Sequence, residues 1–199
     1  MVKEGVPFIA VPVLAAIGFA IFHFWITAAV LVFFALFMAY FFRDPKRTMP
    51  VEPGIVVSAA DGRVTRIDET DEGKLVSVFL SPLDVHINRS PIAGQIKSVT
   101  YIRGKKHPAT SNNASLYNER NSLLIEGENL TVVCTQIAGI LARRIVCWFK
   151  EGDNLELGQK FGLIKFSSRT DVLMPTGVEI MVKVGDRVRG GETIIARLQ

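Results

Sequence analysis

The chain changes pattern near residue 45, from one long apolar run to short apolar segments separated by polar turns. Between Glu4 and Arg43, 38 consecutive residues contain no Asp, Glu, Lys or Arg. As a single helix, residues 7–42 would be roughly 54 Å long, far more than the ~30 Å hydrocarbon core of a bilayer. The pattern predicts two helical arms in a membrane hairpin. The break is expected near residues 22–25, where His23 lies among aromatic side chains that favour the interface.

The polar flank of this run predicts its orientation. Arg43, Lys46 and Arg47 follow directly in "FRDPKR", and basic residues mark the cytoplasmic side of a membrane segment. We expect residues 1–47 to anchor the chain in the cell membrane and residues 48–199 to lie on the cytoplasmic side. A cleaved signal peptide is the alternative, but the run is too long and no small-residue cleavage site precedes the polar region.

Residues 48–199 show the pattern of β-strands. Runs such as "KLVSVFLS", "LTVVCTQIAG" and "RRIVCWF" are rich in Val and Ile and are bounded by Gly, Asp and Pro, with no long helical pattern. Strands at this spacing predict a mainly β protein, a barrel or a sandwich. The segment "EGDNLELGQKFGLI" at 151–164 matches "VGDRVRGGETIIAR" at 184–197 with a constant offset of 33. Two hairpins related in this way resemble the flattened β-barrel of biotinyl and lipoyl domains.

Charge and cysteine content narrow the classes of partner. The chain carries 23 basic and 19 acidic residues, a net charge of +4. This basic excess is too small to indicate a nucleic-acid partner, and the sequence shows no basic stripe with interleaved aromatic residues. A mild basic excess beside a membrane segment suits an anionic lipid surface. Cys134 and Cys147 lie in apolar runs and are interpreted as reduced core residues. Neither has His or Cys at metal-ligand spacing, so we predict no metal site.

Two polar stretches lie in the first half of the β region. "SAADGRV" contains Asp61, and an Asp-Gly pair by itself is typical of a turn. "LSPLDVHINRSP", residues 80–91, would place Asp84, His86 and Asn88 on one face of a strand and Arg89 on the other. A single His is more often structural than catalytic.

Two further stretches lie later in the chain. "NERN", residues 118–121, is by itself typical of a charged turn. "FGLIKFSSRTDVLMP", residues 161–175, ends a predicted strand at Ser167 and Ser168 but lacks the glycines of a serine-hydrolase elbow. These residues alone indicate a membrane-anchored β protein with a candidate nucleophilic serine.

Five segments taken together and in order carry a resemblance: "SAADGRV", "FLSPLDVHINRSPIAG", "NERN", "IAGILARRIV" and "FGLIKFSSRTDVLMP". They resemble the short form of the phosphatidylserine decarboxylase family, which includes archaeal archaetidylserine decarboxylases. The similarity spans about residues 40–199, and the apolar anchor fits it. The resemblance implies decarboxylation of a phosphatidylserine-type lipid to the phosphatidylethanolamine type.

The resemblance also implies that the chain makes its own cofactor. Members cleave themselves at a serine, which becomes a pyruvoyl group, and the matching residue here is Ser168, with cleavage between Ser167 and Ser168. The ketone of that group forms a Schiff base with the substrate amine and takes up the electron pair left by CO₂. Asp61 matches the Asp of the family's Asp-Gly motif and His86 the His of its Asp-x-His motif. Both are expected to take part in activating the serine.

Other roles follow from the same resemblance. Longer members carry a second His where this chain has Arg89. Arg89, Arg120 and Arg169 are candidates for binding the phosphate or carboxylate of the headgroup, with salt bridges as the alternative. The implied partners are the phospholipid, the membrane and the chain's own two pieces. These are a β chain of residues 1–167 and an α chain of residues 168–199, in a heterodimer or a dimer of heterodimers.

Ser167 departs from the Gly-Ser pair of the family's cleavage site. Glycine would let the backbone adopt the strained turn that exposes its carbonyl, whereas Ser167 adds a Cβ and a competing hydroxyl. The alternatives at this point are a processing-deficient member with slowed or blocked cleavage, an engineered uncleavable form, and a branch of the family that tolerates Ser. A non-enzymatic membrane adaptor with a lipoyl-like domain is the alternative from another class. It predicts a coiled-coil insertion between the two half-motifs, which the sequence lacks.

Overall fold

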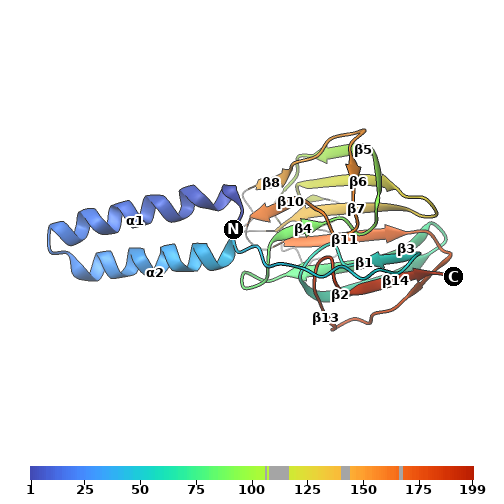
Figure 1. The fold of residues 1–199 in the computed structure, drawn as a ribbon, viewed down its shortest axis with the longest axis horizontal. Coiled ribbons are helices and arrows are strands. Elements are labelled where there is room, and N and C mark those ends of the chain that lie inside the picture. The colour runs from blue at the N-terminus through green and yellow to red at the C-terminus, as the bar shows by residue number, and fades with distance from the viewer. Residues whose placement is uncertain (106, 108–116, 140–143, 166–167) are drawn as a thin grey trace. The chain divides into compact units, whose positions relative to one another are not determined.

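The computed structural model describes residues 1–105, 107, 117–139, 144–165 and 168–199. It divides the chain into two compact units, Met1–Lys46 and Arg47–Gln199 (Figure 1). The division falls one residue before the boundary expected from the sequence. Arg47 belongs to the second unit because its side chain contacts Asp61 and Glu192 there.

The first unit is a hairpin of two apolar helices. A short 3-10 turn, η1 (Lys3–Gly5), leads into α1 (Val6–Ile21), and α2 (Trp25–Phe41) returns alongside it. The break lies at the expected place, where His23 adopts a positive φ of 64°. The segment Lys3–Ile21, with 19 residues, is long and apolar enough to cross a membrane, and α2 is shorter.

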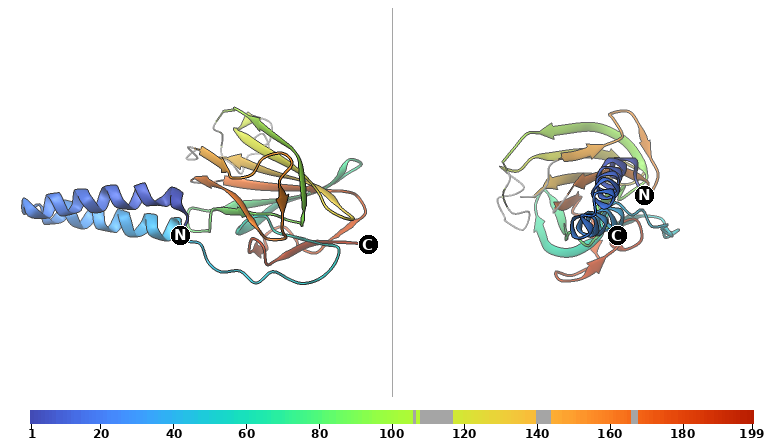
Figure 2. Two further views of the ribbon diagram at one scale, coloured as in Figure 1. Left: turned by 45° about the horizontal axis from the view of Figure 1, so that its top comes forward. Right: turned by 90° about the vertical axis from the view of Figure 1, so that its left-hand side faces the viewer.

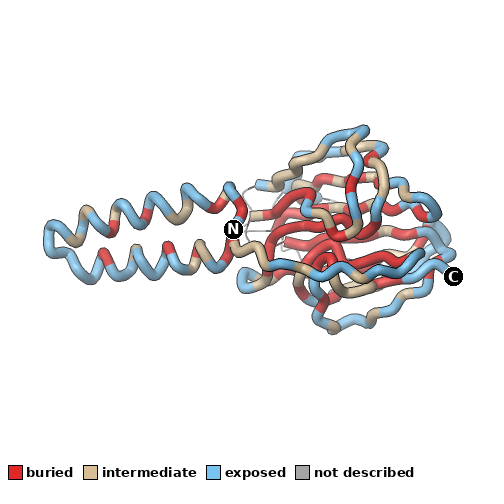
Figure 3. Tube along the Cα trace, viewed as in Figure 1, coloured by how far each residue is buried: buried red, intermediate tan, exposed pale blue. Residues whose placement is uncertain are grey.

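The hairpin has small side chains between its two helices and large apolar side chains on its outer surface. Small residues are buried between the helices, among them Ala16, Ala28 and Ala35, so the two backbones approach closely. Large apolar side chains such as Ile26 and Phe33 point outward, and most of both helices is exposed (Figure 3). Apolar patches of this extent mark a surface that contacts lipid or protein.

The described part of the second unit contains fourteen strands. Their bounds are β1 (Ile55–Val57), β2 (Gly62–Thr70), β3 (Gly73–Leu80), β4 (Ile87–Arg89), β5 (Gly94–Ile102), β6 (Arg120–Glu126), β7 (Thr131–Ala138), β8 (Arg144–Cys147), β9 (Asn154–Leu155), β10 (Lys160–Lys165), β11 (Ser168–Met174), β12 (Val178–Ile180), β13 (Arg187–Val188) and β14 (Ile194–Leu198). The prediction of a mainly β fold with an N-terminal helical hairpin is confirmed.

These strands form one large and two small antiparallel sheets. The large sheet has the order β13-β2-β3-β11-β7-β6-β5-β9, and the small sheets have the orders β1-β14-β12 and β4-β10-β8. The large sheet curls into half a barrel, as the end-on view in Figure 2 shows. The core contains fully buried apolar side chains such as Leu80, Ile96 and Phe161. Each such side chain contributes about 1.5–3 kcal/mol on burial.

The sequence repeat at an offset of 33 is visible as structural symmetry. The backbone N–H of Lys150 donates to Oδ2 of Asp153 at 2.9 Å, and that of Lys183 donates to Oδ2 of Asp186 at 3.0 Å. The following strands also correspond: β9 and β13 end the large sheet on opposite sides, and β10 and β14 are central in the two small sheets. One half of the fold is therefore β4–β10, and the other combines β1–β3 with β11–β14.

One end of the large sheet carries the candidate residues. Arg63, Phe79, Arg169, Ile137 and Arg120 pair in a single row across β2, β3, β11, β7 and β6. Beyond this row β3 and β7 end, while β2 and β11 begin. We call this edge the Ser168 end of the sheet.

Candidate active site

Ser168 is the first residue of β11 and pairs with Leu80 of β3 and Ala138 of β7. It is fully buried, and its Oγ has no hydrogen-bond partner among the described residues. A buried polar group without a partner costs about 1–3 kcal/mol, so it calls for a functional explanation. Ser77 in the middle of β3 shares this condition. Ser168 is therefore distinguished by two properties together: its Oγ has no hydrogen-bond partner among the described residues, and it is the first residue of a central strand.

His86 lies in the loop before β4 and is 2% exposed. Its Nδ1 is 2.9 Å from the backbone oxygen of Asp84. Because a carbonyl oxygen only accepts, Nδ1 carries the proton of the neutral imidazole and Nε2 is the basic nitrogen. β4 begins only at Ile87, so the strand alternation of side chains that was predicted over residues 84–89 holds for residues 87–89 alone.

The carboxylate of Asp84 holds this loop in place. Its Oδ2 accepts hydrogen bonds from the backbone N–H of Ser81 at 2.9 Å and from the Ser81 hydroxyl at 2.6 Å. Its Oδ1 lies 3.5 Å from Nη1 of Arg187. Asp84 therefore closes the turn that presents His86, which is a structural role.

A hydrogen bond between β4 and β11 brings His86 and Ser168 to the same end of the sheet. Asn88 donates from Nδ2 to Oγ1 of Thr170 at 2.8 Å. β4 is antiparallel to β10, and β10 and β11 run in opposite directions in Figure 1, so β4 and β11 run the same way. Two residues back along the chain lead from this pair to His86, directly before β4, and to Ser168, the first residue of β11.

The contact between Asn88 and Thr170 belongs to a chain of buried polar side chains. Nε2 of Gln136 in β7 donates to Oδ1 of Asn88 at 2.9 Å, and Nδ2 of Asn121 in β6 donates to Oε1 of Gln136 at 3.0 Å. All four residues are at most 3% exposed. Such a network favours one arrangement, because any displaced member leaves a buried group unsatisfied. Sequence reasoning missed Gln136 and Thr170, since a polar residue within a strand does not show what it faces.

Asp61 lies directly before β2, also at the Ser168 end. Its Oδ2 accepts a hydrogen bond from Nη2 of Arg47 at 2.6 Å, and its Oδ1 accepts one from the backbone N–H of Gly190 at 2.8 Å. The adjacent Gly62 has a φ of 151°, and a Cβ there would lie 2.0 Å from the backbone oxygen of Phe79. The glycine of this Asp-Gly pair is therefore required by the close approach of β2 to β3.

The three candidate substrate-binding arginines differ in their contacts. Nε and Nη2 of Arg169 lie 2.9 and 3.0 Å from the two carboxylate oxygens of Asp171, in a pair that is almost fully buried. Arg89 is 7% exposed and donates from Nη1 to the backbone oxygen of Gly158 at 3.0 Å. Arg120, at the start of β6, is partly exposed. Arg169 and Arg89 are thus buried within the fold, and Arg120 is the least buried of the three.

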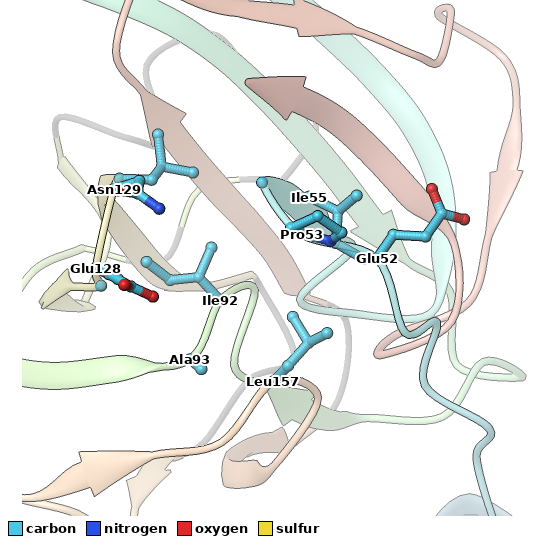
Figure 4. A pocket seen from close by; sticks show the side chains of 11 residues that line it. Glu52, Pro53, Ile55, Ile92, Ala93, Glu128, Asn129 and Leu157 are labelled. Atoms are coloured by element: carbon cyan, nitrogen blue, oxygen red, sulfur yellow. The ribbon is translucent and has the colours of Figure 1, made fainter. Parts of the chain in front are cut away.

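A cavity of about 200 Å³ lies away from these residues. Figure 4 shows Ile55, Ile92, Leu157 and Glu128 among the side chains around it. Part of its wall is the turn from β6 to β7, at residues 127–130, at the opposite end of the sheet from Ser168. None of the candidate residues lines it. Ser167, on the other side of the expected cleavage bond, lies outside the described residues.

The two cysteines, and clusters of acidic residues in the described part of the chain, are the remaining candidates for chemistry. Both cysteines are free, as predicted. Burial raises the pKa of the Cys134 thiol and that of the Cys147 thiol, which favours the protonated form of both near neutral pH. The described residues contain no group of three or more His, Cys, Asp or Glu side chains that could hold a metal ion.

Comparison with known families agrees with this geometry. A family model described as phosphatidylserine decarboxylase matches residues 34–196. The chain belongs to the phosphatidylserine decarboxylase family. The match includes Asp61, His86 and Ser168 and nearly all of the second unit, whereas α1 lies outside it. The resemblance drawn from the five sequence segments is confirmed.

Individual members of the phosphatidylserine decarboxylase family are similar over most of their length. The phosphatidylserine decarboxylase proenzyme of Symbiobacterium thermophilum is 47% identical over 204 residues, which cover 98% of this chain and 94% of that protein. The proenzyme of Anaplasma phagocytophilum is 44% identical over 206 residues, 98% of this chain and 90% of that protein. That of Gluconobacter oxydans is 48% identical over 178 residues, 83% of this chain and 78% of that protein.

Proposed function

We propose that the chain is the precursor of a pyruvoyl-dependent decarboxylase that converts phosphatidylserine to phosphatidylethanolamine. The observation that carries this proposal is the isolated, buried hydroxyl of Ser168 at the start of β11, at the same end of the sheet as the buried His86. Family membership supports the reaction class. The names of the relatives favour phosphatidylserine over archaetidylserine as the lipid.

The proposed self-processing uses groups of the chain itself. Nε2 of His86 takes the hydroxyl proton while Oγ of Ser168 attacks the carbonyl carbon of Ser167. The C–N bond then breaks as this proton passes to the nitrogen of residue 168, so the peptide bond becomes an ester. Removal of the Cα proton of residue 168 then breaks its Oγ–Cβ bond and frees a carboxylate at residue 167. The dehydroalanine left at residue 168 takes up water and loses ammonia, which gives the pyruvoyl group.

The surroundings of Ser168 fit such a group. Leu80 and Ala138 flank the position on the two neighbouring strands, and both are fully buried, so water is excluded on these sides. When present, the group supplies a carbonyl that accepts the electron pair left by CO₂. The protein must also hold the charged headgroup. Of the three candidate arginines, Arg120 is best placed to bind its phosphate or carboxylate, because it is partly exposed at this end of the sheet.

The two products of cleavage should remain one folded body. The α chain would contain 32 residues (199 minus 167) and would carry β11–β14. β11 pairs with β3 over Ser168–Met174 and with β7 over Ser168–Leu173, in the middle of the large sheet. Separation of the chains would break both ladders and expose the core. We therefore propose a heterodimer of α and β chains, alone or as a dimer of such pairs.

We also propose that the helical hairpin holds the catalytic unit at the cytoplasmic face of the cell membrane. The 19-residue apolar segment supports membrane association. Arg43, Lys46 and Arg47 follow α2 directly, and basic residues at this end of an apolar segment favour the cytoplasmic side. Protease added to inverted membrane vesicles should digest the second unit, and protease added to right-side-out vesicles should not. The reverse pattern would exclude this orientation.

Intact-mass measurement tests the central proposal. The parent chain, Ser167→Gly and Ser168→Ala are each analysed with and without a reagent that traps carbonyl groups. We expect a 32-residue fragment with a trapped carbonyl from Ser167→Gly, and none from Ser168→Ala. An intact parent chain beside a cleaved Ser167→Gly chain would show that Ser167 makes this member processing-deficient. A Ser167→Gly chain that stays uncut, or a Ser168→Ala chain that gains the carbonyl, would contradict the pyruvoyl proposal.

A further inference from the structure

Arg47 connects the catalytic carboxylate candidate to a distant turn. Its Nη2 lies 2.6 Å from Oδ2 of Asp61, and its Nη1 lies 3.2 Å from Oε2 of a second carboxylate, Glu192. The Arg47 side chain is only 7% exposed, whereas those of Asp61 and Glu192 are 16% and 24% exposed. A planar guanidinium can bridge two carboxylates at once, which a lysine ammonium on a flexible stem does less well.

The bridge is held from both sides. The backbone N–H of Thr48 donates to Oε1 of Glu192 at 3.0 Å. Glu192 therefore binds both the Arg47 side chain and the main chain next to Arg47. These two interactions lower the pKa of Glu192, with the Thr48 N–H as the larger cause. On the other side, the backbone N–H of Gly190 donates to Oδ1 of Asp61 at 2.8 Å. Segments 47–48, 61 and 190–192 therefore form one connected cluster.

The contacts of Asp61 restrict what this residue can do. Each of its two oxygens accepts a hydrogen bond from a fixed donor, one from a guanidinium and one from a backbone amide. The carboxylate plane is therefore set by donors on two different segments of the chain. We assign the role of base for the Ser168 hydroxyl to His86, as in the self-processing proposed above.

We propose that Arg47 is a positioning residue for the self-cleavage reaction, acting through Asp61. This inference rests on the proposed function, because it assigns a role within that reaction. Arg47 holds the Asp61 carboxylate in one orientation and ties it to Glu192 in the turn between β13 and β14. Sequence reasoning had interpreted Arg47 only as part of the basic flank of the membrane segment.

The test measures the rate of self-cleavage of the full chain during cell-free synthesis with phospholipid vesicles. Ser167→Gly is the reference, so that Ser167 does not limit the rate. Arg47→Ala, Arg47→Lys and Glu192→Gln are made in this reference. The matched control is Arg197→Ala, which removes another arginine that pairs with a carboxylate, Glu52 at 2.7 Å, on the surface of the same unit. Arg47→Ala is also assayed with added guanidinium ion, which can occupy the vacated position.

We expect Arg47→Ala to slow cleavage about 10–100-fold, the loss typical of a misplaced catalytic group. Arg47→Lys should recover part of that loss, and guanidinium ion should accelerate Arg47→Ala but not the reference. Glu192→Gln should slow cleavage less than Arg47→Ala does, and Arg197→Ala should cleave at the reference rate. Rescue by a free cation would not follow from a purely structural defect.

The test separates a failure of the proposed function from a failure of the inference about Arg47. If the reference stays uncut, the proposed function is wrong and the role of Arg47 falls with it. If the reference is cut and Arg47→Ala is cut at the same rate, only the inference about Arg47 is overturned. It is also overturned if Arg47→Ala is slow but neither Arg47→Lys nor guanidinium ion restores any rate, because the loss is then one of folding.

Discussion

Replacement of Asn88 should show how much of the fold and of the site depends on the buried polar network. Asn88 is fully buried and lies in the middle of that network, between Thr170 and Gln136. Asn88→Ala removes both hydrogen bonds at once. Asn121→Ala is the matched variant, because Asn121 lies at the end of the network, where its side chain hydrogen-bonds Gln136 and the Cys147 thiol.

The expected magnitude follows from the groups left without partners. Asn88→Ala leaves Oγ1 of Thr170 without its donor and deprives Nε2 of Gln136 of its closer acceptor, because the remaining contact to the backbone oxygen of Val146 is 3.4 Å long. At about 1–3 kcal/mol for each buried group, the free energy of unfolding should fall by roughly 2–6 kcal/mol. Asn121→Ala leaves Oε1 of Gln136 without its donor and removes a weak contact to the Cys147 thiol, so its cost should be about 1–3 kcal/mol.

Denaturant unfolding of the full chain in detergent measures both costs. The Ser168→Ala background keeps the chain in one piece, so that a two-state analysis applies. In the cleavable Ser167→Gly chain, Asn88→Ala should also slow self-cleavage, because the hydrogen bond to Thr170 aligns the strand of His86 with that of Ser168. A cost below about 1 kcal/mol for Asn88→Ala, or one no larger than that of Asn121→Ala, would refute this reasoning.

Three further outcomes are expected. Gly62→Ala should destabilise the fold by about 3 kcal/mol or more in thermal unfolding, because its Cβ would lie 2.0 Å from the backbone oxygen of Phe79, whereas Gly177→Ala, with no atom within 4 Å, should change little. Glu192→Gln should lower the free energy of unfolding at pH 7, because the folded-state pKa of Glu192 is depressed. The difference in stability between the two chains should disappear as the pH falls below about 4, where the carboxylate becomes protonated. A difference that persists at low pH would contradict this. The Cys134 thiol, fully buried with a raised pKa, should react with a thiol reagent only after unfolding, and rapid labelling of the native protein would show that the strand opens.

The large divisions of this protein are determined by its sequence. The 38-residue run without Asp, Glu, Lys or Arg predicts the helical hairpin, and the break at His23 follows from the limited thickness of a bilayer. The repeat at an offset of 33 predicts two related hairpins, because Gly-Asp turns are closed by local hydrogen bonds such as that from Lys150 to Asp153. These features depend on residues close together in the chain, so a local pattern is sufficient to predict them.

The candidate site is determined by the sequence only in part. Asp61, His86 and Ser168 stood out through their resemblance to a family, and the structure adds that His86 and Ser168 are buried at one end of a sheet. Other residues of the same motifs have purely structural roles in this fold. Gly62 is needed for strand approach and Asp84 closes a turn, so the motif letters alone could not separate chemistry from geometry.

The contacts that orient the site are decided by tertiary structure. Arg47 meets Glu192 across 145 residues of sequence, and Asn88 meets Thr170 across 82. Alternation along a strand shows which side chains share a face, but it does not show which strand lies opposite. That choice depends on the order of strands in the sheets and on their register, which the whole core sets at once. For this reason the sequence could indicate a reactive serine, while only the folded chain could show which side chains hold its surroundings in place.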